Sequence, residues 1–224
     1  ISVAIFAIMI LNRRKMRISE YIKSAAVALS LAAAGTANAD LVWNAEKGWE
    51  VQGGVIANVL GEAKTVSNAL QAMNEGKRAQ EDGENRGALS YYKTIITQYP
   101  DSIFAPEAYY QMSLVYTKRG QFMDAFESLQ EVVKRYPDYP KFNRIIGEEY
   151  NVASIIQSGA TPYLWGWFPW FTNYNDAIKI YEGVVKNAPY SDYAPISLMN
   201  ISLIAEQEDT PEVAFDALDR LINN

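Results

Sequence analysis

One phrase recurs along this chain: a small residue, eleven further residues and then a proline. Its three copies run from Ala88 to Pro100, from Ala125 to Pro137 and from Ala177 to Pro189. The first two copies are 37 residues apart. A fixed period in this range is typical of helical-repeat solenoids, in which each repeat packs on its neighbours. The sequence therefore predicts an all-α repeat protein, whose extended surface suits binding better than catalysis.

The same units align without gaps when the chain is shifted by 89 residues. Positions 100–133 then lie on positions 189–222, and nine of the 34 pairs are identical. A shift of 89 is one period of 37 plus 52, so one unit contains about 15 extra residues. They fall between Gly159 and Asn175 and read ATPYLWGWFPWFTNY.

This insertion is rich in aromatic residues, and insertions in solenoids map to loops on one face. Three interpretations remain open: it folds back between neighbouring repeats, it docks on a partner protein, or it lies in a membrane interface. No basic cluster flanks it, which disfavours the membrane interpretation. The candidate docking residues are Trp165, Trp167, Phe168, Trp170 and Phe171.

Composition excludes several kinds of chemistry. The chain has no Cys and no His, which removes thiol nucleophiles, imidazole bases, disulfides and ordinary zinc sites. We therefore expect that the chain is not an enzyme and that it binds neither a cofactor nor a metal ion. The net charge of -6 argues against nucleic acid as a partner. Acidic pairs such as Glu148-Glu149 and Glu206/Glu208 leave a carboxylate-based hydrolase as an alternative, but they read more simply as solvated helix faces.

The N-terminal region predicts export. Met16 to Lys23 is short, polar and basic, Ser24 to Gly35 is apolar, and residues 36–39 offer a cleavage site after Ala39. Residues 16–39 thus read as a signal peptide, with a buried Ala-rich helix as the alternative. Cleavage would leave 15 basic and 25 acidic residues, a net charge of -10. Residues 1–15 are interpreted as upstream read-through or a non-native start, since their 11 apolar residues are too few for a membrane anchor.

The rest of the chain divides at about residue 60. Residues 40–60 contain two Trp and a Gly53-Gly54 break, which predicts a short irregular arm. A repeat domain follows over residues 61–224, with helices expected at 62–80 and 88–98 and a turn at 82–85. Ser102 is a candidate N-cap of the next helix. The proline in phase with Ala214 would fall two residues beyond Asn224, so we expect the repeat domain to be truncated.

Small residues also recur twelve positions before the first residue of the phrase, at Gly76, Ser113 and Ser202. With Ala and Pro in phase, these units resemble tetratricopeptide repeats over about residues 70–224. The resemblance implies a superhelix of antiparallel helix pairs, one of them interrupted by the aromatic-rich loop. One position departs from the family, which has Ala where this chain has Ile95, Val132, Val184 and Leu221. Repeat tyrosines at helical spacing are expected in the core: Tyr92, Tyr109, Tyr116 and Tyr181.

In the family pattern, one set of positions lines a concave groove. A mixed aromatic, Met and charged lining suits an extended or helical peptide, so we expect proteins or peptides as partners. The alternative is a partly exposed face without a ligand. The positions are Met73, Lys77, Glu107, Tyr110, Leu114, Thr117, Lys118, Tyr150, Met199, Leu203 and Glu206.

A narrower resemblance rests on the phrase YPDSIFAPEAYYQMSLVY, the Ala-Phe helix start at Ala125 and a second Tyr-Pro. These resemble the BamD-type (YfiO-like) outer-membrane assembly lipoproteins, which implies a periplasmic scaffold of the machine that folds outer-membrane β-barrels. The chain departs from them because Thr36 follows Gly35 where a lipoprotein has Cys. We therefore expect a protein of the periplasm, peripheral to the outer membrane at most. The alternative is an accessory docking protein of another envelope complex, such as one coordinating peptidoglycan and outer membrane.

Overall fold

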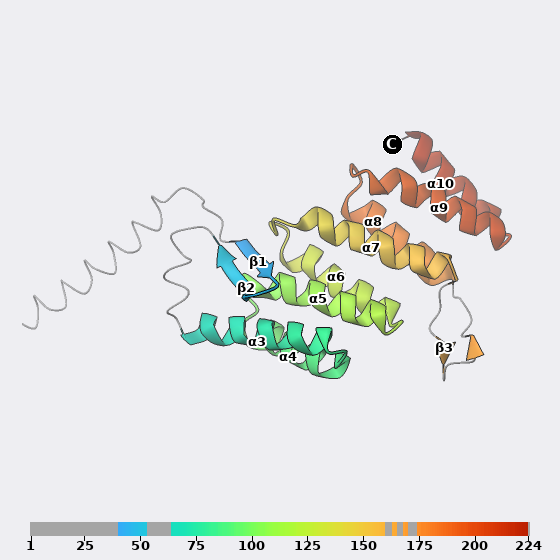
Figure 1. The fold of residues 1–224 in the computed structure, drawn as a ribbon. Helices are drawn as coiled ribbons and strands as arrows, with labels where there is room; N and C mark the ends of the chain where they lie inside the picture. The colour runs from blue at the N-terminus through green and yellow to red at the C-terminus, as the bar shows by residue number, and fades with distance from the viewer. Residues whose placement is uncertain (1–39, 53–63, 160–162, 165–167, 170–173, 224) are drawn as a thin grey trace, which may run out of the picture. The chain divides into compact units, whose positions relative to one another are not determined.

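A computed structural model describes residues 40–52, 64–159, 163–164, 168–169 and 174–223. The chain divides into two compact units, residues 1–67 and 68–224. Within the described residues, helices follow one another in antiparallel pairs from α3 to α10 (Figure 1). The pairs are α3 (Lys64–Glu81) with α4 (Asn85–Gln98), α5 (Phe104–Lys118) with α6 (Phe122–Arg135), α7 (Phe142–Gln157) with α8 (Tyr174–Asn187), and α9 (Tyr193–Gln207) with α10 (Pro211–Asn223).

The repeated proline ends the second helix of three successive pairs. The last helical turn closes through the same backbone bond each time, from the residue before the proline to the residue four positions earlier. These donors are Tyr99, Tyr136 and Ala188. Proline has no amide hydrogen and clashes with the preceding turn, so the helix cannot continue. The prediction of an all-α repeat fold is confirmed.

Ser102 has a different role from the one its sequence predicts. Helix α5 begins at Phe104 without a side-chain cap, so Ser102 is not its N-cap. Instead the Ser102 hydroxyl donates to the carbonyl of Tyr99 at 2.7 Å. Ser191 makes the equivalent bond to Ala188 at 2.8 Å. The repeated serine thus stabilises the turn between two pairs, because a short hydroxyl side chain bonds readily to its own local backbone.

Small residues allow the helices to approach closely. Ala88, Ala125 and Ala177 are fully buried. A Cβ atom added at Gly76 of α3 would lie 2.7 Å from the Tyr92 ring of α4. Glycine at such a position admits a neighbouring ring, whereas a larger residue would force the helices apart.

One apolar core extends through the last two pairs. It joins buried residues of α6, α7, α8, α9 and α10, and a second cluster lies between α5, α6 and α7. The tyrosines expected in the core are buried at Tyr92, Tyr109 and Tyr181, and Tyr116 is partly buried against the larger cluster. The Tyr92 hydroxyl donates to Gln80 and the Tyr181 hydroxyl to Gln157, so both buried phenols have partners.

The expectation of an irregular arm at residues 40–60 is wrong for its first part. Strands β1 (Asp40–Asn44) and β2 (Gly48–Gln52) form an antiparallel hairpin, with Leu41 opposite Val51. The Asn44 side chain accepts from the amides of Glu46 and Lys47 in the turn. Gly48 has φ of 85°, which glycine adopts without strain. The Trp43 and Trp49 rings pack at 5.5 Å, and such cross-strand aromatic pairs stabilise hairpins.

The insertion between α7 and α8 contains two short paired strands, β3 (Tyr163–Leu164) and β4 (Phe168–Pro169). Trp165, Trp167, Trp170 and Phe171 lie outside the described residues, as does the side chain of Phe168. The same holds for the predicted signal peptide. None of the helices in the described ranges is long and apolar enough to cross a membrane.

Candidate peptide-binding face

The first helices of the pairs present the positions that the repeat pattern assigns to a groove. We call the surface of α5, α7 and α9 formed by Tyr110, Leu114, Tyr150, Met199 and Leu203 the first-helix face. All five side chains are partly or largely exposed. Their mixture of aromatic, thioether and aliphatic groups provides apolar area that can adapt to a bound segment.

Helix α9 has an exposed apolar stripe, in which Ile196 adjoins two residues of the first-helix face. Ile196, Met199 and Leu203 are exposed by 48%, 43% and 50%. They lie three and four residues apart and thus share one side of the helix. The opposite side is fully buried, with Leu198 and Ile201 in the core. Glu206 continues the exposed stripe and places a charge at its end.

Helix α7 supports the face with an ordered aromatic group. The Tyr150 ring lies 5.5 Å from both Tyr181 of α8 and Tyr193 of α9. The Asn200 side chain donates to the Tyr150 hydroxyl at 3.2 Å. These contacts hold Tyr150 in place beside α9, so a ligand would meet a surface that is already ordered.

Helix α5 adds a ring covered by a cation. The Arg144 guanidinium of α7 lies 3.9 Å from the centroid of the Tyr110 ring, a cation–π contact. Burial raises the pKa of Tyr110, the charge of Glu148 raises it further, and Arg144 opposes them. Leu114 and Thr117 are partly exposed and Lys118 is exposed on the following turns of α5.

Two positions expected in the groove do not line it. Met73 and Glu107 are fully buried, so neither can face an open groove. Glu107 accepts hydrogen bonds from Arg144, from Tyr139 at 2.6 Å and from Gln111 at 2.9 Å. A buried carboxylate requires such partners because desolvation of an isolated charge is costly. Glu107 therefore ties α5 to α7 and is not a ligand contact.

Lys77, the remaining predicted groove position, is partly exposed on α3, and its ammonium group lies 3.8 Å from Glu81. Besides Lys77, the predicted groove positions that stay exposed to solvent in the described part of the chain are those of α5, α7 and α9.

Glu149 is a further buried acid, and the prediction that it lies on a solvated helix face is wrong. It is fully buried on α7. It accepts from Gln130 of α6 at 2.8 Å and from Asn187 of α8 at 3.0 Å. Burial raises the pKa of Glu149 to about 7, although both amide donors act to lower it. Its spacing from Ile145 and Val152 places it on the apolar stripe of α7, and that spacing is the signal that could have revealed it.

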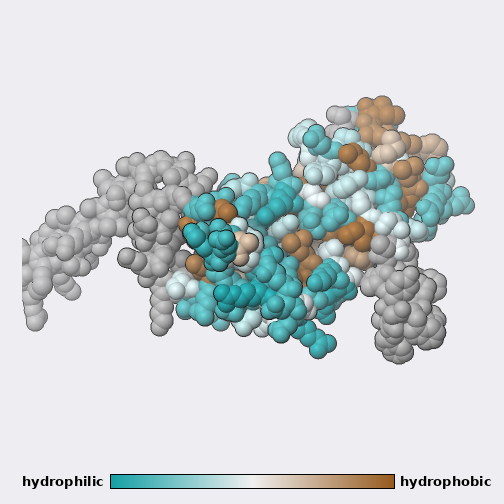
Figure 2. Space-filling model, in the orientation of Figure 1, coloured by the Kyte–Doolittle hydropathy of each residue, from teal (hydrophilic) through white to brown (hydrophobic). Residues whose placement is uncertain are grey.

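The C-terminal pair has exposed apolar surface on both helices. Brown residues gather over α9 and α10 in Figure 2, whereas the α3–α4 end is mostly teal. Phe215 of α10 is 72% exposed, but its repeat equivalent Phe126 is only 7% exposed. A Cβ atom added at Gly183 of α8 would lie 2.6 Å from the Phe126 ring. Phe126 of α6 is thus covered by α8 of the following pair.

Among the described residues, no group of three or more acidic side chains is placed to hold a metal ion. The acids that are strongly buried, Glu107 and Glu149, are occupied by hydrogen bonds between helices. The first-helix face therefore offers exposed aromatic, thioether and aliphatic contact area, with the charges of Lys118 and Glu206 beside it.

Comparisons with known proteins agree with this architecture. Residues 66–102 and 107–139 match the family model of the tetratricopeptide repeat, and these ranges cover the pairs α3/α4 and α5/α6. No curated protein matches the chain.

Several solved structures are similar to the chain, and two of them serve as examples. A crystal structure of MamA protein is 15% identical, with 70% of this chain and 91% of that chain covered and a TM-score of 0.32. A Podosopora anserina putative kinesin light chain with nearly identical TPR-like repeats is 14% identical, with 75% and 80% covered and a TM-score of 0.41.

Proposed function

Because the chain is built from tetratricopeptide repeats, we propose that it is a protein-binding scaffold of the Gram-negative cell envelope. The observation that supports binding most directly is the exposed stripe of Ile196, Met199 and Leu203 on α9. Export is supported by the signal-like segment at residues 16–39. The role proposed is that of a periplasmic scaffold in outer-membrane β-barrel assembly, as the BamD-type phrase implies.

The stripe on α9 fits an apolar segment of a partner protein. Each of its three side chains is about half exposed, so covering them would contribute about 1 kcal/mol per side chain. A partner residue stacking on Tyr150 would add aromatic contact without reordering that ring. The charges of Lys118 and Glu206 fix orientation more than affinity, because both are solvent exposed. An amphipathic helix or an extended segment with apolar residues at alternate positions meets these requirements.

The test is recovery of partners from envelope extracts with Leu203→Asp compared with the unchanged chain. A charge at this position would have to be buried under the partner, which is strongly unfavourable. We expect β-barrel assembly subunits to be recovered with the unchanged chain and lost with Leu203→Asp. Val213→Asp on α10 is the matched control, because Val213 is also an exposed aliphatic residue. Equal recovery with both variants would contradict a site on α9.

The identity of the recovered proteins separates the two envelope roles. Recovery of other envelope complexes alone would contradict the assembly role and favour the accessory docking protein. Mass spectrometry of the N-terminus of the mature protein tests export separately. A chain that begins at Asp40 supports cleavage, and a chain that retains residues 16–39 contradicts it.

A further inference from the structure

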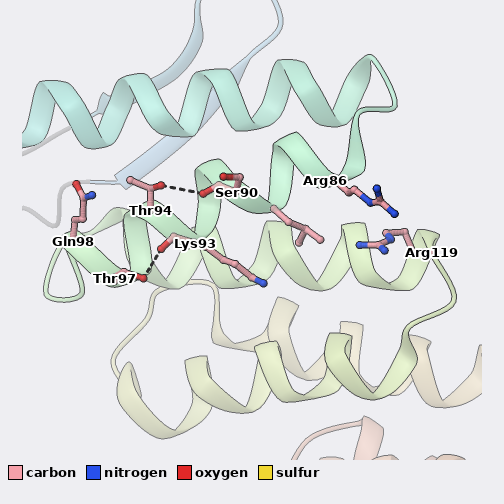
Figure 3. A pocket seen from close by; sticks show the side chains of 8 residues that line it. Arg86, Ser90, Lys93, Thr94, Thr97, Gln98 and Arg119 are labelled. Carbon is pink, nitrogen blue, oxygen red and sulfur yellow. Dashed lines mark hydrogen bonds between the residues drawn. The ribbon is translucent and has the colours of Figure 1, made fainter.

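A hollow of about 540 Å³ lies along α4, one of the second helices of the pairs (Figure 3). Seven of its lining residues belong to α4, and Arg119 comes from the turn between α5 and α6. Three of the eight lining side chains are cations and none is an acid. The lining residues are Arg86, Leu89, Ser90, Lys93, Thr94, Thr97, Gln98 and Arg119.

The two arginines of this hollow differ from the other arginines that the structure describes. Each of those others lies within 4.0 Å of a carboxylate: Arg78 of Glu75, Arg135 of Glu131, Arg144 of Glu107, and Arg220 of Glu182. Arg86 and Arg119 have no such pair within the described ranges. This is unexpected in a chain with a net charge of -6. The guanidinium groups of Arg86 and Arg119 also point toward one another in Figure 3, an arrangement that an anion between them would stabilise.

The third cation lies farther along the helix. Lys93 follows Arg86 by seven residues, about 10 Å along the axis of α4. An extended peptide covers that distance in about three residues. Arg86 and Arg119 also line a second hollow, which includes Glu84. The negative charge of Glu84 disfavours the approach of an anion through this second hollow. The open direction therefore runs along α4 toward Lys93.

The hydroxyl groups of the hollow are mostly engaged. Thr94 donates to the carbonyl of Ser90 at 3.0 Å, and Thr97 donates to that of Lys93 at 2.7 Å. These hydrogens are thus occupied within the helix and are not offered to an anion. The free side-chain donors of the hollow are therefore the three cationic groups, the Ser90 hydroxyl and, at its far end, the amide of Gln98.

We propose that this hollow binds a carboxylate-rich, extended segment of a partner protein. One acidic side chain of the segment lies between Arg86 and Arg119, and a second, three residues away, pairs with Lys93. The paired arginines suit a carboxylate because the planar guanidinium binds both of its oxygens. The site is separate from the first-helix face and does not depend on the function proposed for it.

The probe is a fluorescein-labelled peptide with the core Glu-Ser-Ser-Glu, and its control has the core Gln-Ser-Ser-Gln. Anisotropy at low salt is expected to show saturable binding of the first peptide only. Binding should weaken as salt is raised, because exposed charge pairs are screened. Arg119→Glu is expected to weaken binding at least about tenfold, since it replaces an attraction by a repulsion.

Lys179→Glu is the matched control, because it makes the same charge change at an exposed site on α8. It should bind the peptide within about twofold of the unchanged chain. Circular dichroism must show that both variants stay folded. The proposal is wrong if Arg119→Glu binds as tightly as Lys179→Glu, or if the unchanged chain gives no saturable binding at millimolar peptide.

A second set of measurements distinguishes a segment from a simple anion. Lys93→Ala should weaken binding of the two-carboxylate peptide several-fold but leave a peptide with a single Glu unaffected. Inorganic phosphate, tested as a competitor, should displace the peptide only at much higher concentration, because it cannot reach both ends of the hollow. Displacement by phosphate at the concentration of the peptide would reduce the site to a general anion site and contradict the proposal.

Discussion

The buried carboxyl of Glu149 makes the stability of the repeat domain depend on pH. Glu149 lies between α6, α7 and α8, and its two hydrogen-bond donors are the neutral amides of Gln130 and Asn187. Burial raises its pKa from 4.5 to about 7. In the unfolded chain the carboxyl is hydrated and regains its ordinary pKa. The folded state therefore holds a proton that the unfolded state releases between about pH 4.5 and 7.

The sign and size of the effect follow from this difference. The pKa is raised in the folded state, so protonation favours folding below about pH 4.5 and the benefit is lost as pH rises to about 7. Above that pH the charged carboxyl destabilises the fold by a constant amount. A shift of this size corresponds to about 3 kcal/mol. Replacement by Gln removes the charge and keeps one acceptor oxygen. The side-chain amides of Gln130 and Asn187 can rotate to pair with the new amide group.

The assay is urea unfolding of the full chain and of Glu149→Gln, followed by circular dichroism between pH 4.5 and 8.5. We expect the two proteins to differ little at pH 4.5 and the variant to be more stable by about 1–3 kcal/mol at pH 8, after imperfect amide pairing is allowed for. Glu127→Gln on the exposed side of α6 is the control and should show no such change with pH. A difference in stability between Glu149→Gln and the unchanged chain that is constant over the whole pH range would contradict a raised pKa of Glu149 in the folded state.

Three further predictions concern packing and the insertion. Gly183→Ala places a methyl group 2.6 Å from the Phe126 ring, so it should destabilise by about 1–3 kcal/mol in urea unfolding. Gly87→Ala, where the nearest atom is 3.6 Å away, should instead stabilise by up to about 1 kcal/mol, and equal effects would contradict the packing account. Arg144→Ala removes the cation beside buried Glu107 and should lower the free energy of unfolding by about 3 kcal/mol, or by less if Lys141 pairs with Glu107 instead. An unchanged free energy of unfolding in urea would show that the hydrogen bonds from Tyr139 and Gln111 are enough to stabilise the buried carboxylate. Joint replacement of Trp165, Trp167 and Trp170 by Ala distinguishes the roles of the insertion. A lower melting temperature with unchanged recovery of partners indicates packing between repeats. Lost recovery at an unchanged melting temperature indicates docking on a partner.

The sequence predicts those features that depend on local pattern. The helix ends at Pro100, Pro137 and Pro189 follow from the chemistry of proline, and the buried Ala88, Ala125 and Ala177 follow from the repeat period. Exposure of Met199 and Leu203 also follows, because the repeat pattern places them on the groove-lining side of α9, away from the core. Features of this kind need only one helix pair to be interpreted correctly.

The remaining features depend on residues that are distant along the chain. Glu107 is buried because Tyr139, from the connection between α6 and α7, and Arg144 of α7 close over it. Neither partner is apparent from the local sequence, so the repeat pattern alone places Glu107 in the groove. The hollow on α4 is equally non-local, since Arg86 and Arg119 are 33 residues apart. The hairpin at residues 40–52 was missed because two short strands give a weak alternating pattern and depend on pairing across a turn.

We propose that the exposed stripe of α9 contacts a partner protein in the cell envelope. This contact can be tested in intact cells by replacing Leu203 of the full chain with a photo-crosslinking amino acid and identifying the captured proteins. The control position is Tyr190, which is 95% exposed in the turn before α9. We expect position 203 to capture a subunit of the β-barrel assembly machine and position 190 not to capture it. Capture of the same proteins from both positions, or of none from position 203, would contradict it.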